Sequence, residues 1–421
     1  MYNGNSPRKG GIPLKRDKEG MVTMSRLKVG QFNDSFPPTI DGVAQAVKNY
    51  AGVMQEKFCD VTVVTPKYKD VVDNYPFEVF RYRSIPLDKR IGYRAGNPFD
   101  IETLIKLRNK HFDLMHVHAP FASSVLVQNI NRKPKVPVVL TYHTKFDIDI
   151  AKRVKLTGFR KIALRFVLEN INAVDEVWVV TEGCGKALRN IGYRGGYRVM
   201  ENGTDFAYGK ADPDKVGKLR EKYGVKDDEF VFLFVGRMMW YKNIRLVLDS
   251  LKYLKAHGVP LRAFLVGDGF DAPDIRKYAA EIGLEKEATF TGPIYDREYL
   301  RVFYSMADMF LFPSTYDTSG IVVKEAAACD CPTLLVRESC ASEGVEHDYS
   351  GFLAEENAES CGRVLLDACQ SREHIREVGA NAGKHIYLSW ETAVGRAYQR
   401  YTEILETGPG QLPYNSRHQW I

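Results

Sequence analysis

The chain has 421 residues, of which 44% are hydrophobic and 27% are charged. This length exceeds one ordinary hydrophobic core and predicts two domains, and the composition is that of a globular protein, which excludes wholesale disorder and fibrous architecture. The 59 Lys and Arg residues outnumber the 53 Asp and Glu residues and leave a formal charge of +6. This mild excess favours phosphates or an anionic surface as partners, but it is too small for a nucleic-acid-binding protein.

The seven cysteines form an odd set without a C-x-x-C pair, which indicates free thiols in a reducing compartment. The sequence has no run of about 18 apolar residues, so we expect no transmembrane helix. Residues 1–24 are polar and basic and lack the apolar core of a signal peptide. We therefore expect a flexible lead-in and a cytoplasmic protein.

Short apolar runs alternate with amphipathic segments through the first half of the chain. The runs at 27–30, 61–64, 114–117, 138–141 and 176–180 predict strands, and residues 43–57 predict a helix. Strands that alternate with helices of 10–15 residues indicate βαβ units and a parallel sheet buried on both faces. Residues 25–203 are therefore predicted to form a Rossmann-like domain.

The same pattern starts again after a polar stretch near residues 200–215. Five strands are predicted at 230–235, 263–266, 288–290, 309–312 and 333–336, and the helix at 243–256 carries an apolar stripe of Ile244, Val247, Leu248, Leu251 and Leu254. Residues 204–388 are thus predicted to form a second Rossmann-like domain. A last helix in 389–407 is expected to pack back on the first domain, and 408–421 to form a loose tail.

The predicted fold class is α/β, with two doubly wound parallel-sheet domains facing a cleft. Open α/β sheets bind ligands at the carboxyl ends of their strands. We therefore expect the functional residues to follow the strands directly.

The strand at 230–235 is followed by Gly236 and Arg237, and Lys242 comes at the start of the next helix. Glycine allows a tight turn, the guanidinium offers a bidentate fork, and a lysine near a helix N-terminus adds a point charge. This combination suits a diphosphate. Taken alone, both cations can also be solvated loop charges.

A helix N-terminus is predicted after the strand at 309–312. Thr318 or Ser319 can cap this helix, and Gly320 leaves its first amides, at Ile321 and Val322, open to an anion.

Two carboxylates flank these amides. Asp317 precedes the helix, and Glu325 lies eight residues later in an apolar helical segment, where an unpaired carboxylate would be costly. The pair can bind different hydroxyls of one extended ligand. The alternatives are a helix cap for Asp317 and a surface charge for Glu325.

A further motif, Gly267-Asp268-Gly269, follows the strand at 263–266. It is an incomplete dinucleotide fingerprint, and alone it is a weak indication of the wall of a nucleotide pocket.

Together these motifs resemble the donor half of the family 4 retaining glycosyltransferases of the GT-B fold, over about residues 27–400. The resemblance implies that Arg237 and Lys242 neutralise the diphosphate of a nucleotide-sugar donor, with the amides after Gly320. It also implies that Glu325 holds the ribose hydroxyls and Asp317 the hydroxyls of the donor sugar. The family usually has Glu-x7-Glu, and Asp317 is one methylene shorter than the usual first Glu.

The first half also has polar residues after its strands. Gly42 opens a helix after the loop at 33–41, so its backbone can approach a phosphate or a sugar, although a plain connecting loop is the alternative. His116 and His118 flank Val117 at a strand end, and we expect them to point to opposite faces, which disfavours a two-histidine metal site. His143 ends the next strand in the same way, and each histidine can also be an ordinary packed side chain.

The text His116-Val117-His118-Ala119-Pro120-Phe121, with the Tyr142–Thr144 segment and Ser84-Ile85-Pro86, is similar to the branch of the family that glucosylates diacylglycerol or makes related glycolipids. This resemblance implies that His118 lies beside the sugar and the acceptor. It also places His143 and Phe121 on the acceptor side, and the loop of Gly42 opposite the donor.

Residues 145–165 are rich in basic residues that alternate with apolar ones, as in a helix that lies on an anionic membrane surface. A solvated helix with its apolar side on the domain core is the alternative. The predicted membrane contacts are Lys152, Arg153, Lys155, Arg160 and Lys161.

The sequence therefore predicts a hexosyltransferase that moves a sugar from a nucleotide-diphosphate sugar, with UDP-glucose or UDP-galactose favoured, to a hydroxyl of a membrane lipid or glycolipid, with retention of configuration. No Asp-x-Asp motif stands in a suitable place, so we expect no metal or other cofactor to be required. We expect no nucleic-acid partner and a peripheral position on the inner face of the cell membrane.

Three alternatives stay open. They are a GT-B nucleotide-sugar epimerase, a family 4 enzyme with a mannosyl donor or a polysaccharide acceptor, and a non-catalytic nucleotide-sugar binding protein. The oligomeric state is also left open.

Overall fold

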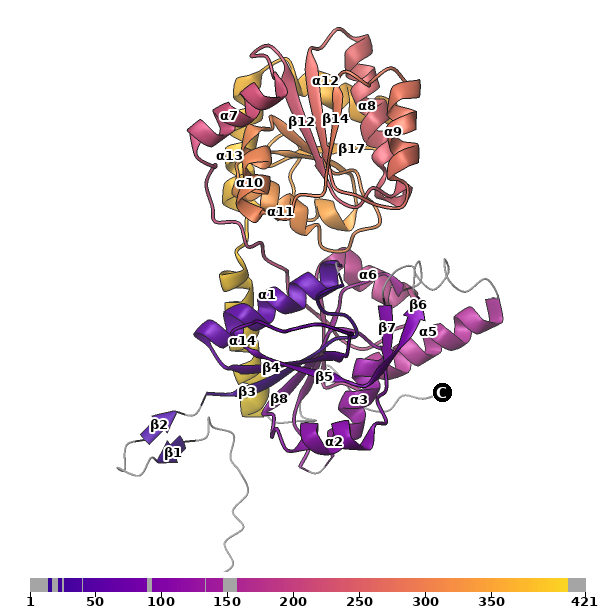
Figure 1. The fold of residues 1–421 in the computed structure, drawn as a ribbon, viewed down its shortest axis with the longest axis vertical. Coiled ribbons are helices and arrows are strands. Elements are labelled where there is room, and N and C mark those ends of the chain that lie inside the picture. Colours follow the sequence, from indigo (N-terminus) through magenta and orange to yellow (C-terminus); the bar gives the residue numbers. More distant parts are fainter. Residues whose placement is uncertain are drawn as a thin grey trace, which may run out of the picture. The chain divides into compact units, whose positions relative to one another are not determined.

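The computed structural model describes residues 14–16, 22–24, 26–39, 41–88, 93–132, 134–146 and 157–407. The chain divides into two compact units, Met1–Glu201 with Trp390–Ile421 and Asn202–Ser389. The boundaries expected from the sequence, after residues 203 and 388, lie within two residues of these divisions. Each unit is a parallel sheet flanked by helices (Figure 1).

The first unit contains a seven-stranded parallel sheet with the order β11-β10-β9-β8-β3-β4-β5. Its strands are β3 (Lys28–Phe32), β4 (Asp60–Pro66), β5 (Glu78–Tyr82), β8 (Leu114–Val117), β9 (Val138–Tyr142), β10 (Glu176–Val179) and β11 (Arg198–Val199). Its helices are α1 (Gly42–Lys57), α2 (Ile101–Arg108), α3 (Ala122–Ile130), α5 (Thr157–Asn172), α6 (Glu182–Asn190) and α14 (Trp390–Thr407).

The central strands of this sheet are buried along their whole length, as expected for strands covered by helices on both faces. Every residue of β8, β9 and β10 is buried. The strand order reverses between β3 and β8, which are neighbours although 85 residues separate the paired residues Gln31 and His116. Ligands of open α/β sheets bind at such a reversal, so the loops after β3 and β8 are the expected site.

Several strands of the first unit were not predicted. β5 and β11 are edge strands, and β6 (Ser84–Asp88) and β7 (Tyr93–Gly96) form a separate antiparallel pair. β1 (Leu14–Arg16) and β2 (Val22–Met24) also pair with each other, within the segment expected to be a flexible lead-in. These strands are short and carry charged or polar residues, so they lack the apolar runs by which the central strands were found.

The second unit contains a six-stranded parallel sheet with the order β14-β13-β12-β15-β16-β17. Its strands are β12 (Phe230–Val235), β13 (Leu261–Val266), β14 (Ala288–Gly292), β15 (Met309–Leu311), β16 (Thr333–Val336) and β17 (Phe352–Ala354). Its helices are α7 (Pro213–Tyr223), α8 (Ile244–Ala256), α9 (Ala272–Glu281), α10 (Arg297–Met306), α11 (Ile321–Ala328), α12 (Ala358–Ala368) and α13 (Arg372–His385), with short 3-10 turns at Trp240–Lys242 and Cys340–Ser342.

All five strands predicted for this half are present, and the three-residue β17 is an addition. The apolar stripe of α8 is confirmed, since Ile244, Val247, Leu248, Leu251 and Leu254 are all buried. The strand order reverses between β12 and β15, which lie side by side. The loops after these two strands carry the predicted diphosphate and carboxylate residues.

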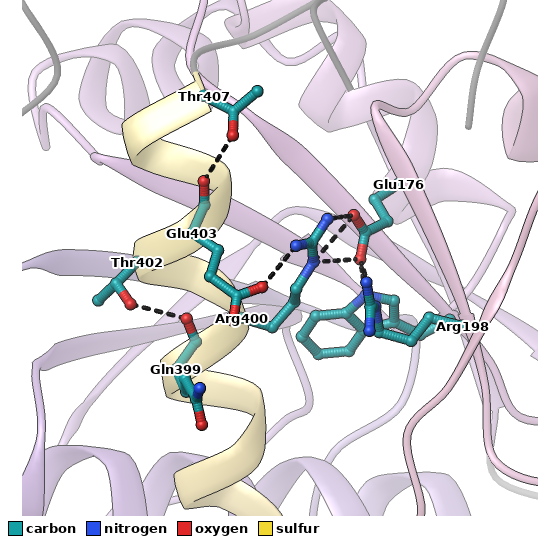
Figure 2. Close-up of polar contacts among 8 residues, drawn as sticks. Glu176, Arg198, Gln399, Arg400, Thr402, Glu403 and Thr407 are labelled. Atoms are coloured by element: carbon teal, nitrogen blue, oxygen red, sulfur yellow. Dashed lines mark hydrogen bonds and ion pairs between the residues drawn. The ribbon is translucent and has the colours of Figure 1, made fainter. Parts of the chain in front are cut away.

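The last helix, α14, belongs to the first unit and contacts α1 there. Figure 2 shows how its Arg400 meets Glu176 of β10. The guanidinium Nε lies 3.0 and 3.1 Å from the two carboxylate oxygens of Glu176, which is 2% exposed. Trp178 donates its indole N–H to the same carboxylate at 2.7 Å, and Arg198 lies 3.6 Å from it. A buried charge is thus fully paired, and it ties α14 to the sheet.

Among the described residues, no helix combines the length and the apolar character that crossing a membrane requires. All seven cysteines are free thiols, and all but the half-buried Cys369 are buried. This agrees with the free thiols expected from the sequence.

Candidate functional site

The predicted donor residues of the second unit come together at the reversal of its strand order. β12 leads into Gly236 and Arg237, and β15 leads into the loop that contains Asp317. Arg237 is exposed, whereas Lys242 and Asp317 are half-buried. Because β12 and β15 are paired, their carboxyl ends deliver both loops to one edge of the sheet.

Lys242 and Asp317 form an ion pair at this edge. The Nζ atom of Lys242 lies 2.5 Å from Oδ1 of Asp317, and the two side chains are 14% and 23% exposed. The ammonium also lies 5.7 and 5.6 Å from the ring centres of Tyr241 and Tyr316. The cation is therefore held by one carboxylate and two aromatic faces.

Asn243 positions this lysine. It adopts a left-handed backbone conformation with φ of 57°, which asparagine tolerates better than most residues, and it separates the turn of Lys242 from α8. Its side-chain amide donates to the carbonyl of Pro313 at 2.9 Å and to Glu356 at 2.6 Å. The turn after β12 is thereby tied to the loop after β15. Lys242 lies in a 3-10 turn before the helix, and not in its first turn.

The second oxygen of Asp317 is a buried acceptor without a partner among the described residues. A buried acceptor that lacks a donor is costly, so such atoms in native proteins usually mark a place for water or a ligand. A sugar hydroxyl is a donor of the required kind.

The Gly267-Asp268-Gly269 motif packs directly on the turn after β12. A Cβ atom at Gly267 would lie 1.9 Å from the carbonyl oxygen of Gly236, and one at Gly269 would lie 2.5 Å from that of Met238. Asp268 is exposed, and its Oδ1 accepts a hydrogen bond from the Gly269 amide at 2.8 Å. The glycines thus allow two backbone segments to approach closely, and contact of this motif with a nucleotide stays a prediction.

Helix α11 begins without a side-chain cap, which corrects the expectation for Thr318 or Ser319. Its N-cap residue is Gly320, with φ of 53° in the left-handed region. Ser319 accepts instead from the Asn202 side-chain amide at 3.1 Å. The first residues of the helix, Ile321 and Val322, are half-buried. Their end of the helix carries positive partial charge and can face an anion.

Glu325 is buried and has partners that were not predicted. One carboxylate oxygen lies 2.6 Å from Nη2 of Arg297, and the other accepts from the Tyr304 hydroxyl at 2.9 Å. Burial, and then the charge of Glu325, raises the pKa of Tyr304 well above its usual value, so this hydroxyl stays protonated. Arg297 also pairs with Asp205. The carboxylate is therefore satisfied within the fold, although each oxygen can accept a further hydrogen bond.

The histidines of the first unit lie close together, and the expectation of opposite faces is wrong. The ring centres of His116 and His118 are 4.0 Å apart. Residues two positions apart in a strand share a face, because side chains alternate with a period of two. His143 belongs to the same cluster, with its Nε2 2.9 Å from Nδ1 of His118.

All three rings are buried in a network of hydrogen bonds. His116 contacts the Tyr401 hydroxyl at 2.5 Å, and Nε2 of His118 lies 2.6 Å from Oε1 of Gln31. Burial lowers the pKa of His143 to about 3 and the pKa values of His116 and His118 well below the usual range. The cluster is therefore neutral at physiological pH. Since both ring nitrogens of His118 are engaged, its contact with sugar and acceptor stays a prediction.

Asp34, in the loop after β3, is a titratable residue that the sequence did not single out. Its Oδ1 accepts from the amide and the hydroxyl of Ser123, both at 2.8 Å, and its Oδ2 is buried without a partner among the described residues. Burial raises its pKa to about 6. Such a carboxyl group can take up or release a proton near neutral pH.

The loop of Asp34 ends at the N-terminus of α1. Asp41 caps this helix by accepting from the Ala44 amide at 2.7 Å, and Gly42 is exposed with open space around it. Phe121 is half-buried, and its ring packs edge-on against Phe146 at 5.1 Å. Gly42 and Phe121 are therefore both accessible to some extent, and their contact with a ligand stays a prediction.

Of the predicted membrane contacts, Lys152, Arg153 and Lys155 lie outside the described residues. Arg160 and Lys161 lie on α5, where Lys161 is exposed and Arg160 half-buried. The same helix exposes three large apolar residues, Phe159 by 62%, Ile162 by 66% and Phe166 by 42%. It also packs Val167 and Ile171 into the core of the unit. One side of α5 is therefore packed on the domain core, and contact of its exposed side with a membrane stays a prediction.

Within the part of the chain that the structure describes, no group of three or more His, Cys, Asp or Glu residues is arranged to hold a metal ion.

Two family models match the chain. "Glycosyltransferase Family 4" matches residues 40–208 and "Glycosyl transferases group 1" matches residues 216–385, so that each covers most of one half. Among solved structures, HepE from Anabaena in complex with UDP superimposes with a TM-score of 0.74 at 18% identity, over 90% of this chain and 100% of that one. A second structure of that protein contains UDP and glucose. Fold and sequence together define a glycosyltransferase with the GT-B fold.

The curated relatives include two proteins named alpha-monoglucosyldiacylglycerol synthase. The one from Streptococcus pneumoniae is 25% identical over 87% of this chain and 86% of its own length, and the one from Acholeplasma laidlawii is 25% identical over 90% and 96%. Glycosyltransferase family models thus match both halves of the chain, family 4 in the first half and group 1 in the second, and the chain is similar to two glycolipid synthases.

Proposed function

We propose that this protein transfers a hexosyl group from a nucleotide-diphosphate sugar, UDP-glucose or UDP-galactose, to a hydroxyl of a membrane lipid or glycolipid, with retention of configuration. The observation that carries this proposal is the paired Lys242 and Asp317 at the reversal of strand order in the second unit. The donor is supported by UDP in the HepE structures, and the acceptor by the names of the two diacylglycerol-glucosylating relatives.

The cations serve the leaving group. Breaking the bond to the anomeric carbon leaves a diphosphate whose charge must be stabilised, and preorganised cations and amides supply such stabilisation. Lys242 exchanges its contact with Asp317 for a phosphate oxygen, Arg237 adds a second cation from the same turn, and the first amides after Gly320 point their hydrogens at the same anion.

The two carboxylates orient the donor. When Lys242 turns to the phosphate, both oxygens of Asp317 become available to hydroxyls of the sugar, and its second oxygen already lacks a donor. Glu325, held by Arg297 and Tyr304, accepts from the ribose hydroxyls through its remaining lone pairs. These contacts fix the anomeric carbon relative to the diphosphate.

The test is a Lys242→Ala variant, with Lys252→Ala as a control for the loss of one exposed lysine of the same unit. UDP release from UDP-glucose is measured with and without diacylglycerol. We expect Lys242→Ala to lower turnover at least about 100-fold, since single charge-stabilising groups contribute on that scale. Near-normal turnover would remove Lys242 from the mechanism. Appearance of an epimer from donor alone would support the epimerase alternative.

No metal is required in this proposal, because protein cations neutralise the diphosphate. Turnover is expected to be unchanged by EDTA. Loss of activity in EDTA that added Mg²⁺ restores would contradict this part of the proposal.

The protein binds the membrane surface peripherally through α5. Phe159, Ile162 and Phe166 recur at helical spacing on an exposed face, and Lys161 lies next to them. An amphipathic helix of this kind inserts its apolar side chains while its basic residues face anionic lipid. A Phe159→Asn and Ile162→Asn variant should lose binding to vesicles that contain phosphatidylglycerol, while UDP binding is retained. Unchanged vesicle binding would leave the solvated helix as the better interpretation.

A further inference from the structure

A pocket of about 590 Å³ lies in the first unit, apart from the residues assigned above. Its wall combines residues 67–69, which follow β4, with the strand pair β6–β7 and residues 97–98 after it. Figure 1 shows β6 and β7 as a separate strand pair, distinct from the main sheet. Sites for small molecules have volumes in this range.

Four cations line this pocket, namely Lys67, Lys69, Arg83 and Arg94, and none of its described lining residues is acidic. We call it the basic pocket. Lys67, Lys69 and Arg94 make no ion pair with any described residue. Uncompensated cations around a concave surface attract an anion, because low-dielectric walls focus their field.

Arg83 is the exception in this set, since it lies 3.4 Å from Asp100 and 3.6 Å from Glu102. Its side chain is 73% exposed, so these contacts are weak. The excess positive charge of the basic pocket therefore rests on the other three cations.

Arg94 is held in one orientation. Its Nε donates to the Ser84 hydroxyl at 2.8 Å, and its Nη2 donates to the Ser84 carbonyl at 2.9 Å. Its guanidinium carbon lies 6.0 Å from the ring centre of Tyr68. The remaining nitrogen, Nη1, makes no hydrogen bond to the described part of the chain. A guanidinium fixed in this way can bind a phosphate with little further loss of entropy.

A neighbouring arginine shows the contrast. Arg81 lies 5.9 Å from the ring centre of Tyr68, but Asp73 neutralises it through two contacts of 2.7 and 2.8 Å. Arg81 thus completes an internal ion pair, whereas Arg94 has no carboxylate partner in the described structure. The difference indicates that Arg94 binds an anion that is not part of the folded chain.

The basic pocket is connected to the loop after β3. The Thr39 hydroxyl donates to the Tyr68 hydroxyl at 2.8 Å, and Arg81 donates to the Pro37 carbonyl at 2.7 Å. This loop lies at the reversal of strand order and carries Asp34. A ligand in the basic pocket would therefore share a wall with the expected acceptor loop.

We infer that the basic pocket is a subsite for a phosphate ester, filled by the headgroup of an anionic lipid. Lys67, Lys69 and Arg94 contact the phosphate oxygens, and Tyr68 and the 68% exposed Ile85 contact the carbon skeleton next to the phosphate. Phosphate binding here does not depend on the donor site. Its use for an acceptor, or for lipid that promotes acceptor binding, rests on the proposed function.

The experiment uses the full chain and three soluble probes: dihexanoyl phosphatidylglycerol below its micelle concentration, dihexanoylglycerol, and inorganic phosphate. Affinities are measured by calorimetry for the wild type, for Lys67→Gln with Lys69→Gln, and for Arg94→Gln. Arg132→Gln with Lys135→Gln removes two exposed cations elsewhere in the same unit and is the matched control. We expect the phosphatidylglycerol affinity to fall at least about tenfold in both pocket variants and to be unchanged in the control, because hydrogen bonds to charged groups contribute on this scale.

A footprint that needs no variant accompanies these titrations. Acetylation of Lys67 and Lys69 in the wild type, read by mass spectrometry, should slow when phosphatidylglycerol is present, while acetylation of Lys135 should not. Equal affinities in the pocket variants and the control, or no protection of the two lysines, would overturn the inference. Inorganic phosphate that binds as tightly as phosphatidylglycerol would overturn the lipid assignment.

UDP binding separates this inference from the proposed function. The pocket variants should bind UDP as the wild type does, because the donor residues belong to the other unit. If no form of the protein binds UDP, the proposed function fails, and the phosphate-ester titrations still decide the pocket.

Discussion

Acid should unfold the first unit before the second, because the first unit buries a cluster of neutral histidines. Burial lowers the pKa of His143 to about 3, and it moves His116 and His118 in the same direction. An unfolded chain has a histidine pKa near 6.5, so below this pH the unfolded state binds protons that the folded state excludes. Stability is therefore fully present above about pH 6.5 and is lost as the pH falls from there toward the folded pKa.

The magnitude follows from the linkage relation. For His143 alone, the free energy of unfolding should be about 2 kcal/mol smaller at pH 5 than at pH 7.5, with a limiting slope of about 1.4 kcal/mol per pH unit. His116 and His118 add to this loss, whereas protonation of Asp34 in the same unit, whose pKa burial raises to about 6, offsets part of it. The combined effect is a large part of the stability of a typical domain, which is about 5–15 kcal/mol. The histidines of the second unit are exposed or half-buried, and none of them belongs to a buried cluster of this kind.

Hydrogen–deuterium exchange at pH 7.5 and pH 5, corrected for the intrinsic pH effect, reports on each unit through its own peptides. Protection of β8 and β9 should fall at pH 5, while that of β12 and β13 should persist. His143→Gln should reduce the pH slope of the free energy of unfolding by about one proton, whereas His257→Gln, at an exposed position, should not change it. Equal loss of protection in both units would refute the reasoning.

Three further changes test other contacts. Asp34→Asn removes a carboxylate whose charged form is destabilised by burial, so at pH 7.5 it should raise the urea-derived free energy of unfolding by at most about 3 kcal/mol. At pH 5 the gain should be about half as large, because the folded pKa of about 6 keeps much of the carboxyl group protonated. An equal gain at both pH values would contradict this prediction. Arg400→Met should cost about 3 kcal/mol by leaving the Glu176 charge buried, and adding Glu176→Gln should recover part of this loss in thermal unfolding. Gly320→Ala should lower the free energy of unfolding by about 1 kcal/mol and weaken UDP binding, since φ is 53° and the new Cβ would lie 3.1 Å from that of Ala341. An unchanged UDP affinity in calorimetry would show that this turn is not part of the donor site.

The periodic parts of the fold could be predicted because their signal is local. The apolar stripe of α8 and the apolar run of β12 each lie within one short segment of the sequence, and both elements are present in the structure. β5 is different, since Glu78 and Arg81 interrupt its apolar residues at the edge of the sheet. An edge strand needs no continuous apolar run, so its sequence does not separate it from a loop.

The partners within the site were much harder to predict. Lys242 and Asp317 are 75 residues apart, and Arg297 and Glu325 are 28 residues apart. Each motif can be recognised after its own strand, but the sequence does not show which side chains of distant motifs contact each other. Glu325 is an example, since its place in an apolar helical segment indicates a bound partner but does not identify Arg297 and Tyr304, which hold its carboxylate in the structure.

The pairing of Lys242 with Asp317 has a consequence for donor binding. The Asp317 carboxylate lies 2.5 Å from the Lys242 ammonium, which is the group that the diphosphate is proposed to bind. UDP must therefore displace the carboxylate before the diphosphate can contact Lys242. Asp317→Asn removes this competitor, and it should therefore tighten UDP binding several-fold in calorimetry while turnover of UDP-glucose falls, because a contact to the sugar is weakened. Asp274→Asn, which removes an exposed carboxylate of the same unit, should change neither quantity. If Asp317→Asn weakened UDP binding instead, Asp317 would support the diphosphate site and not compete with it.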